Sequence, residues 1–145
     1  MGNKSLAAGA SLLIGASYVV VGIIGFFVTG FGSFLADTGD TLLFGFASIN
    51  PMHNIVHIVV GAFLIAMTRF STASTEGALM GVGLFYITAF VIGVIAPDNL
   101  TIISMNGAGD GENLVHIVTG VTALTAGLLS VARSESAAKR SGIAA

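Results

Sequence analysis

Two stretches of this chain carry the same eight-residue pattern. The first reads Asn54-Ile55-Val56-His57-Ile58-Val59-Val60-Gly61, and the second reads Asn113-Leu114-Val115-His116-Ile117-Val118-Thr119-Gly120. Six of the eight positions are identical, and each stretch begins a long apolar segment. Because polar side chains are costly to keep inside a membrane, the repeated asparagine and histidine indicate where function should be sought.

The composition is that of a membrane protein rather than of a soluble domain. Hydrophobic residues make up 54% of the 145 residues and charged residues only 8%, whereas soluble domains have about 25% charged residues. The net charge of -2 and the lack of a basic patch argue against nucleic acid as a partner. The chain has no cysteine, which excludes disulfides, thiolate catalysis and iron–sulfur ligation.

Four apolar segments have the length needed to cross a hydrocarbon core of about 30 Å at about 1.5 Å per residue. We predict helices over residues 6–29, 51–68, 77–96 and 113–132. The segments lack the alternation of barrel strands, and only helices or closed barrels satisfy backbone polar groups in lipid. The predicted fold is therefore all-α, an integral membrane four-helix bundle that forms a single transmembrane domain over residues 1–145.

The first and third predicted helices also share a pattern. The matched residues are Gly15, Tyr18 and Gly25 in the first helix and Gly83, Tyr86 and Gly93 in the third. The chain is therefore predicted to consist of two tandem hairpin repeats, over about residues 6–68 and 77–132. Each hairpin crosses the membrane twice, so the repeats share one orientation and are related by an axis along the membrane normal.

The charged residues predict the orientation in the membrane. With four spans, all basic residues fall on one side, namely Lys4, Arg69, Arg133, Lys139 and Arg140. The opposite side carries only acidic residues, namely Asp37, Asp40, Asp98, Asp110 and Glu112. Since basic residues mark cytoplasmic loops, both termini are predicted to be cytoplasmic, an N-in/C-in topology.

The connections between the helices carry several local signals. Asn50 and Asp110 are suited to cap the second and fourth helices, and Pro51 suits the first helical position. Residues 40–46 fit a short interfacial helix, while residues 97–111 are predicted to be irregular. Pairs of small residues such as Gly77 and Gly81 predict close helix packing in a tight bundle.

Four polar residues near the repeated motifs form a candidate metal site. Aligning the repeats pairs His53 with Glu112 and His57 with His116. On each helix the two residues are four apart and share a face, so all four are predicted to converge near the outer leaflet. Three imidazoles and a carboxylate suit zinc, copper or iron, although no HExxH motif is present.

A tetrapyrrole is a second candidate ligand. Imidazole is a usual axial ligand of haem iron and, by the same lone-pair logic, of chlorophyll magnesium. His57 and His116 would be the axial ligands, with Gly61 and Gly120 leaving room for the macrocycle one turn deeper. Asn54 or Asn113 would fix the second imidazole nitrogen. Haem b and chlorophyll are therefore the candidate cofactors, and their identity stays open.

A purely structural role is the leading interpretation of the histidines, ahead of the tetrapyrrole and the metal ion. Each histidine would then hydrogen-bond a neighbouring helix, a contact that contributes about 0.6 kcal/mol in membranes. Tyr18 and Tyr86 match in the repeats, and core packing is the expected role for both. No ionisable residue lies at the expected bilayer centre and no proline breaks a helix there, which disfavours a transporter.

The motif region carries a family resemblance. Residues 42–57, which read Leu-Leu-Phe-Gly-Phe-Ala-Ser-Ile-Asn-Pro-Met-His-Asn-Ile-Val-His, and the following Gly61 resemble the hallmark of a bacterial four-span membrane family. That family is catalogued as domain of unknown function 4383. Residues 112–116, Glu-Asn-Leu-Val-His, resemble its second element, where the family has Asp in place of Glu112. The resemblance covers the whole chain and implies the fold, the topology and a bacterial inner or thylakoid membrane, but no activity.

The sequence thus predicts a small non-catalytic integral membrane protein, not an enzyme. The leading hypothesis is an accessory or scaffold subunit of a larger membrane complex, whose partners are the lipid bilayer and other membrane-protein subunits. The alternatives are a tetrapyrrole-binding protein for electron transfer or light harvesting, and a metal-binding membrane protein.

Overall fold

The computed structural model describes residues 5–35, 41–105, 107 and 109–142. The fold is built from four helices, α1 (Leu6–Thr29), α2 (Pro51–Met67), α3 (Thr72–Ile95) and α4 (Gly111–Arg140). Between them lie a two-stranded hairpin, β1 (Leu42–Leu43) with β2 (Ala47–Ser48), and a 3-10 helix, η1 (Pro97–Ile103). The prediction of an all-α fold with four helices is confirmed, while Lys4, Asp37 and Asp40 lie outside the described residues.

Three of the helices have the length and composition of membrane spans. Helices α1, α3 and α4 are long and apolar enough to cross a membrane, while α2 is a shorter apolar helix of 17 residues. Large apolar side chains face outward along them: Leu13, Phe27 and Leu84 are 72%, 87% and 55% exposed. Such faces are unfavourable in water and suit contact with lipid or a partner.

Two helix boundaries differ from the prediction by more than two residues. Helix α3 begins at Thr72 rather than at residue 77, because Ser71 caps it and accepts a hydrogen bond from the backbone N–H of Ser74 (3.1 Å). Helix α4 continues to Arg140 rather than ending at residue 132. Both extensions are polar. Hydropathy marks where a segment stops being apolar, whereas the backbone hydrogen bonds of a helix continue past that point.

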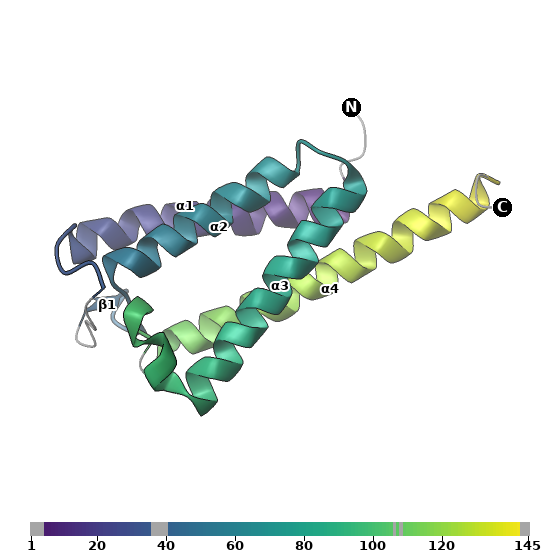
Figure 1. The fold of residues 1–145 in the computed structure, drawn as a ribbon. Helices are drawn as coiled ribbons and strands as arrows, with labels where there is room; N and C mark the ends of the chain where they lie inside the picture. Colours follow the sequence, from purple (N-terminus) through teal and green to yellow (C-terminus); the bar gives the residue numbers. More distant parts are fainter. Residues whose placement is uncertain (1–4, 36–40, 106, 108, 143–145) are drawn as a thin grey trace.

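The four helices form two hairpins, α1 with α2 and α3 with α4 (Figure 1). The start of α1, the connection from α2 to α3 and the end of α4 lie at one end of the molecule. The β-hairpin and η1 lie at the other end. Each helix packs mainly against the other member of its hairpin, and the two hairpins meet less extensively.

Glycines at matched positions bring the helices of each hairpin together. A Cβ atom on Gly15 would lie 2.7 Å from the carbonyl oxygen of Gly61, and one on Gly61 would lie 2.5 Å from that of Gly15. In the second hairpin, Gly83 and Gly120 would each meet the other's carbonyl oxygen at 2.9 Å. Side chains are therefore excluded at these crossings. The two tandem repeats remain a prediction that these contacts favour.

The small-residue pair in α3 does not take part in this packing. A Cβ added to Gly77 or to Gly81 would meet no atom within 4 Å. The expectation that this pair tightens the bundle is therefore wrong for α3. The reason is that Gly77 and Gly81 lie on another face of the helix: Gly83 and Gly93 are the glycines of α3 that face α4.

A β-hairpin replaces the interfacial helix expected over residues 40–46, of which Asp40 is not described. Phe44 and Gly45 both have positive φ, 52° and 79°, which is the backbone of a tight hairpin turn rather than of a helix. Glycine adopts that conformation without a steric penalty. The turn folds Leu43 and Ala47 against Val21 of α1, so the hairpin covers the end of the bundle. Residues 97–103, expected to be irregular, form η1.

Candidate functional site

The first pair of site residues lies in the opening turns of α2. Asn50 caps the helix as predicted, its side chain accepting a hydrogen bond from the backbone N–H of His53 (2.8 Å). Pro51 occupies the first turn, where its missing N–H is harmless. His53 and His57 follow on one face, with ring centroids 4.5 Å apart in an edge-to-face arrangement.

The second pair lies in the opening turns of α4. Asp110 caps this helix as predicted, and its Oδ1 accepts hydrogen bonds from the backbone N–H groups of Glu112 (3.1 Å) and Ser48 (3.1 Å). One carboxylate thus ties the β-hairpin to the start of α4. Glu112 and His116 share the inner face, with Nε2 of His116 3.4 Å from Oε2 of Glu112.

The two pairs meet at a single carboxylate oxygen. Oε2 of Glu112 lies 3.4 Å from Nε2 of His116, 3.6 Å from Nε2 of His53 and 3.9 Å from Nε2 of His57. One ligand atom from each of the four residues lies within 4.8 Å of all the others. None of the four side chains is more than 3% exposed. We call these four residues, which include all three histidines of the chain, the His/Glu cluster.

The converging atoms of the His/Glu cluster have no hydrogen-bond partner in the part of the chain that the structure describes. Among the described residues, none bonds to Glu112 Oε2 or to the Nε2 atoms of His53, His57 and His116. Buried polar atoms are nearly always hydrogen-bonded, and an unpaired one costs about 1–3 kcal/mol. A cation bound between these four atoms would give each of them a partner.

Two tyrosines support the histidine rings from the core side. Tyr18 of α1 has its ring centroid 4.8 Å from that of His57, and Tyr86 of α3 lies 4.9 Å from that of His116. The tyrosine rings are 5.0 Å apart. These residues, expected to be core packing, are buried in the core and also hold the two repeated imidazoles in place.

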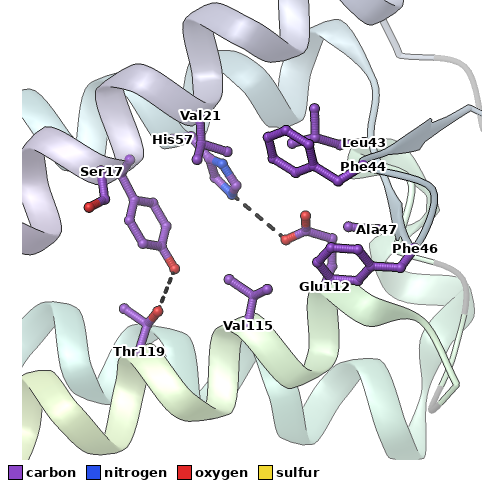
Figure 2. A pocket seen from close by; sticks show the side chains of 11 residues that line it. Ser17, Val21, Leu43, Phe44, Phe46, Ala47, His57, Glu112, Val115 and Thr119 are labelled. Atoms are coloured by element: carbon purple, nitrogen blue, oxygen red, sulfur yellow. Dashed lines mark hydrogen bonds and ion pairs between the residues drawn. The ribbon is translucent and has the colours of Figure 1, made fainter.

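Thr119 is a site residue that sequence reasoning missed. Its Oγ1 accepts a hydrogen bond from the hydroxyl of Tyr18 (2.9 Å), which links α1 to α4 (Figure 2). The position offered one signal: it is where the repeats differ in polarity, since Val60 stands at the matching place in the first motif.

The other residues of the predicted tetrapyrrole site point elsewhere. Asn54 donates to Thr29 Oγ1 (2.9 Å), and Asn113 donates to the carbonyl oxygen of Gly107. Neither amide makes a described hydrogen bond with an imidazole. The space expected for a macrocycle beside Gly61 and Gly120 is filled by α1 and α3.

A cavity of about 250 Å³ adjoins the His/Glu cluster. Figure 2 shows Val21 and Ser17 of α1, His57 of α2, the hairpin residues and the first turns of α4 around it. His57 and Glu112 belong both to the cavity wall and to the cluster.

The fold and the site together define a class of protein. Its members are helical proteins with helices apolar enough to span a membrane, and they carry a buried cluster of three histidines and one glutamate at one end of the bundle. The family model described as Domain of unknown function (DUF4383) matches residues 9–129. The chain belongs to this family, as its motifs predict, and the matched region contains the whole His/Glu cluster. Comparison with curated proteins and with solved structures gave no match.

Proposed function

We propose that this protein is a multi-pass integral membrane protein that binds one divalent first-row transition-metal ion through His53, His57, Glu112 and His116. The observation that carries the proposal is the approach of three Nε2 atoms to one carboxylate oxygen in a buried site. The proposal assigns no catalytic activity to the ion.

The distances in the cluster are near those of a metal site. In a tetrahedral site with bonds of about 2.1 Å, neighbouring ligand atoms lie about 3.4 Å apart. The three Nε2 to Oε2 distances are 3.4, 3.6 and 3.9 Å, and the four ligand atoms all lie within 4.8 Å of one another. Inward movement of the imidazole side chains would close the four ligands on an ion. Three imidazoles with one carboxylate favour zinc, iron or copper.

The side chains of the His/Glu cluster are also held in place by neighbouring contacts. The helix caps made by Asn50 and Asp110 fix the first turns of α2 and α4, and Tyr18 and Tyr86 pack against two of the rings. Preformed ligand positions lower the ordering cost of binding. The position is buried, so an ion there would be shielded from competing water ligands.

The topology proposed with this function has four spans. Helix α2, at 17 residues, is about 25 Å long, which lies at the short end of the range for spanning helices. Arg69 and Arg133 belong to the end of the bundle opposite the His/Glu cluster. The positive-inside rule then assigns that end and both termini to the cytoplasm of a bacterial inner or thylakoid membrane.

Two other hypotheses stay predictions. Membership of a larger complex is compatible with the exposed apolar faces, which suit lipid equally well. A haem b or chlorophyll between His57 and His116 would have to displace Glu112, whose Oε2 lies near both Nε2 atoms. The metal ion is preferred because it would bind the four side chains without displacing any of them.

The test is the metal content of the full chain purified in mild detergent with a tag that contains no histidine. We expect about one metal ion per chain, and a loss of most of it in His57→Gln and His116→Gln. Glu76→Gln is the matched control, because Glu76 is a second buried glutamate, held by Ser130 and Ser134 away from the cluster. Folded wild-type protein that stays metal-free after incubation with zinc, iron or copper would overturn the proposal.

A further inference from the structure

The cavity beside the His/Glu cluster has one polar end and one apolar end. Its deep end is formed by His57 and Glu112, each 2% exposed. Its mouth is formed by Phe44 and Phe46 of the β-hairpin, which are 67% and 51% exposed, with the exposed Ser17 of α1. The mouth therefore opens on the side of the bundle between α1 and α4, toward lipid in the proposed topology.

The polar groups of the cavity gather on the cluster side. Glu112 Oε2 and His57 Nε2 are buried and make no described hydrogen bond. The Tyr18 hydroxyl and Thr119 Oγ1 form a second polar point on the same wall. Apart from Ser17 at the mouth, the rest of the wall is apolar, with Val21 and Val115 facing each other from α1 and α4 in Figure 2.

The volume limits the size of an occupant. The cavity measures about 250 Å³, whereas an apolar cavity of about 150 Å³ in another protein holds a benzene molecule. A single ring with short substituents therefore fits. The aromatic side chains of Tyr18, Phe44 and Phe46 around the space favour a ring as the occupant.

The route of entry limits the charge of the occupant. An ionised group would lose its hydration on passing the apolar mouth and wall, where Phe44, Phe46 and Val21 offer it no opposite charge. A neutral oxygen can meet the polar end as a hydrogen-bond partner of Tyr18 and Thr119. The proposed ligands His57 and Glu112 also form the cavity wall, so that oxygen would lie beside a bound ion.

We propose that the cavity binds a neutral single-ring phenol that arrives from the lipid phase, with its hydroxyl at the His/Glu cluster and its apolar end toward Phe44 and Phe46. The inference rests on the proposed function, because the hydroxyl meets the cluster where the ion would bind. It names the class of ligand that the site takes.

The test uses 4-ethylphenol as the probe and ethylbenzene, which lacks the hydroxyl, as its control. Titration calorimetry on the full chain in detergent should show saturable one-to-one binding of 4-ethylphenol that is at least about tenfold tighter than binding of ethylbenzene. Val115→Phe fills the cavity and should abolish that binding. Val118→Phe, on the exposed side of α4, is the matched control and should leave it unchanged.

Cobalt(II) as the bound metal separates this inference from the proposed function. In cobalt-loaded protein, 4-ethylphenol should shift the visible absorption bands, and Val115→Phe should keep the cobalt bands but lose the shift. Normal cobalt bands with equal binding of both probes, or with binding unaffected by Val115→Phe, would overturn the cavity inference alone. Failure to bind cobalt or any other tested ion would overturn the proposed function, and with it the metal contact of the phenol.

Discussion

His53 and Glu112 occupy matching positions, each immediately before one of the two repeated motifs, and Nε2 of His53 lies 3.6 Å from Oε2 of Glu112. The two halves of the chain are therefore unlike at one important point. An imidazole precedes the first motif and a carboxyl group precedes the second, and that carboxyl group would supply a negative charge on losing its proton to a bound ion. That charge offsets part of the charge of a divalent ion in a buried site.

Glu112→Gln should weaken metal binding more than any change outside the cluster. The amide keeps the size of the side chain but removes the negative charge and most of its strength as a ligand. Because loss of a residue that only supports a ligand costs about 10–100-fold in affinity, we expect a loss of at least about 100-fold. Competition with a chelator of known affinity measures it. Glu76→Gln should bind like wild type, and equal losses in both variants would contradict the assignment.

Metal affinity should fall as the pH is lowered. A proton and a metal ion compete for the same imidazole nitrogen, so binding releases protons and weakens in acid. Lowering the pH from about 8 to about 5 should therefore release the ion from folded protein. Equilibrium dialysis at several pH values tests this, with helix content followed by circular dichroism. Metal retained at the same occupancy across that range would argue against imidazole ligands.

Gly61→Ala should destabilise the first hairpin. The new Cβ would lie 2.5 Å from the carbonyl oxygen of Gly15, so α1 and α2 must separate, at a cost of about 1–3 kcal/mol. Gly81→Ala is the matched control, since its Cβ would meet no atom within 4 Å. The free energy of unfolding in mixed micelles of mild and denaturing detergent compares the two. Similar stabilities for both variants would show that the crossing at Gly15 and Gly61 is looser than described.

The Tyr18 hydroxyl should contribute modestly to stability. Tyr18→Phe removes the 2.9 Å hydrogen bond to Thr119 but keeps the ring against His57. Hydrogen bonds between helices in membranes contribute about 0.6 kcal/mol on average. A double-mutant cycle with Thr119→Val should give a coupling energy of about that size, with metal occupancy unchanged. A coupling energy of zero would mean that the two hydroxyls act independently.

The cysteine-free chain allows a direct test of topology. A cysteine at Ser141, after α4, should react with a membrane-impermeant maleimide only in inverted vesicles. A cysteine at Gly32, after α1, should react only in right-side-out vesicles or intact cells. Labelling of both positions from the same side would contradict four spans.

Much of the fold follows from local sequence signals. Long apolar runs predict helices because lipid leaves the backbone no other hydrogen-bond partners, and the caps at Asn50 and Asp110 depend only on neighbouring residues. The β-hairpin was mispredicted because apolar residues at its start suit an amphipathic helix as well as a strand. The positive φ at Phe44 and Gly45 distinguishes the hairpin turn from a helix, and the sequence does not show it directly.

Part of the candidate site also follows from local sequence signals. Spacing by four placed His53 with His57 and Glu112 with His116 on shared faces, and the repeat suggested that the two faces meet. The roles of Asn54 and Asn113 depend on what stands opposite them. Opposite Asn54 and Asn113 stand Gly25 and Gly93, where any side chain would collide with the amide, and no spacing within one helix reveals such a partner.

The most direct test of the central claim is an X-ray absorption spectrum at the metal edge of the purified, metal-loaded full chain. The account predicts a first shell of nitrogen and oxygen at about 2.0–2.1 Å with outer-shell scattering from about three imidazoles, matching the three histidines of the cluster. A spectrum with oxygen ligands only, or with the scattering of fewer than two imidazoles, would contradict binding at the His/Glu cluster.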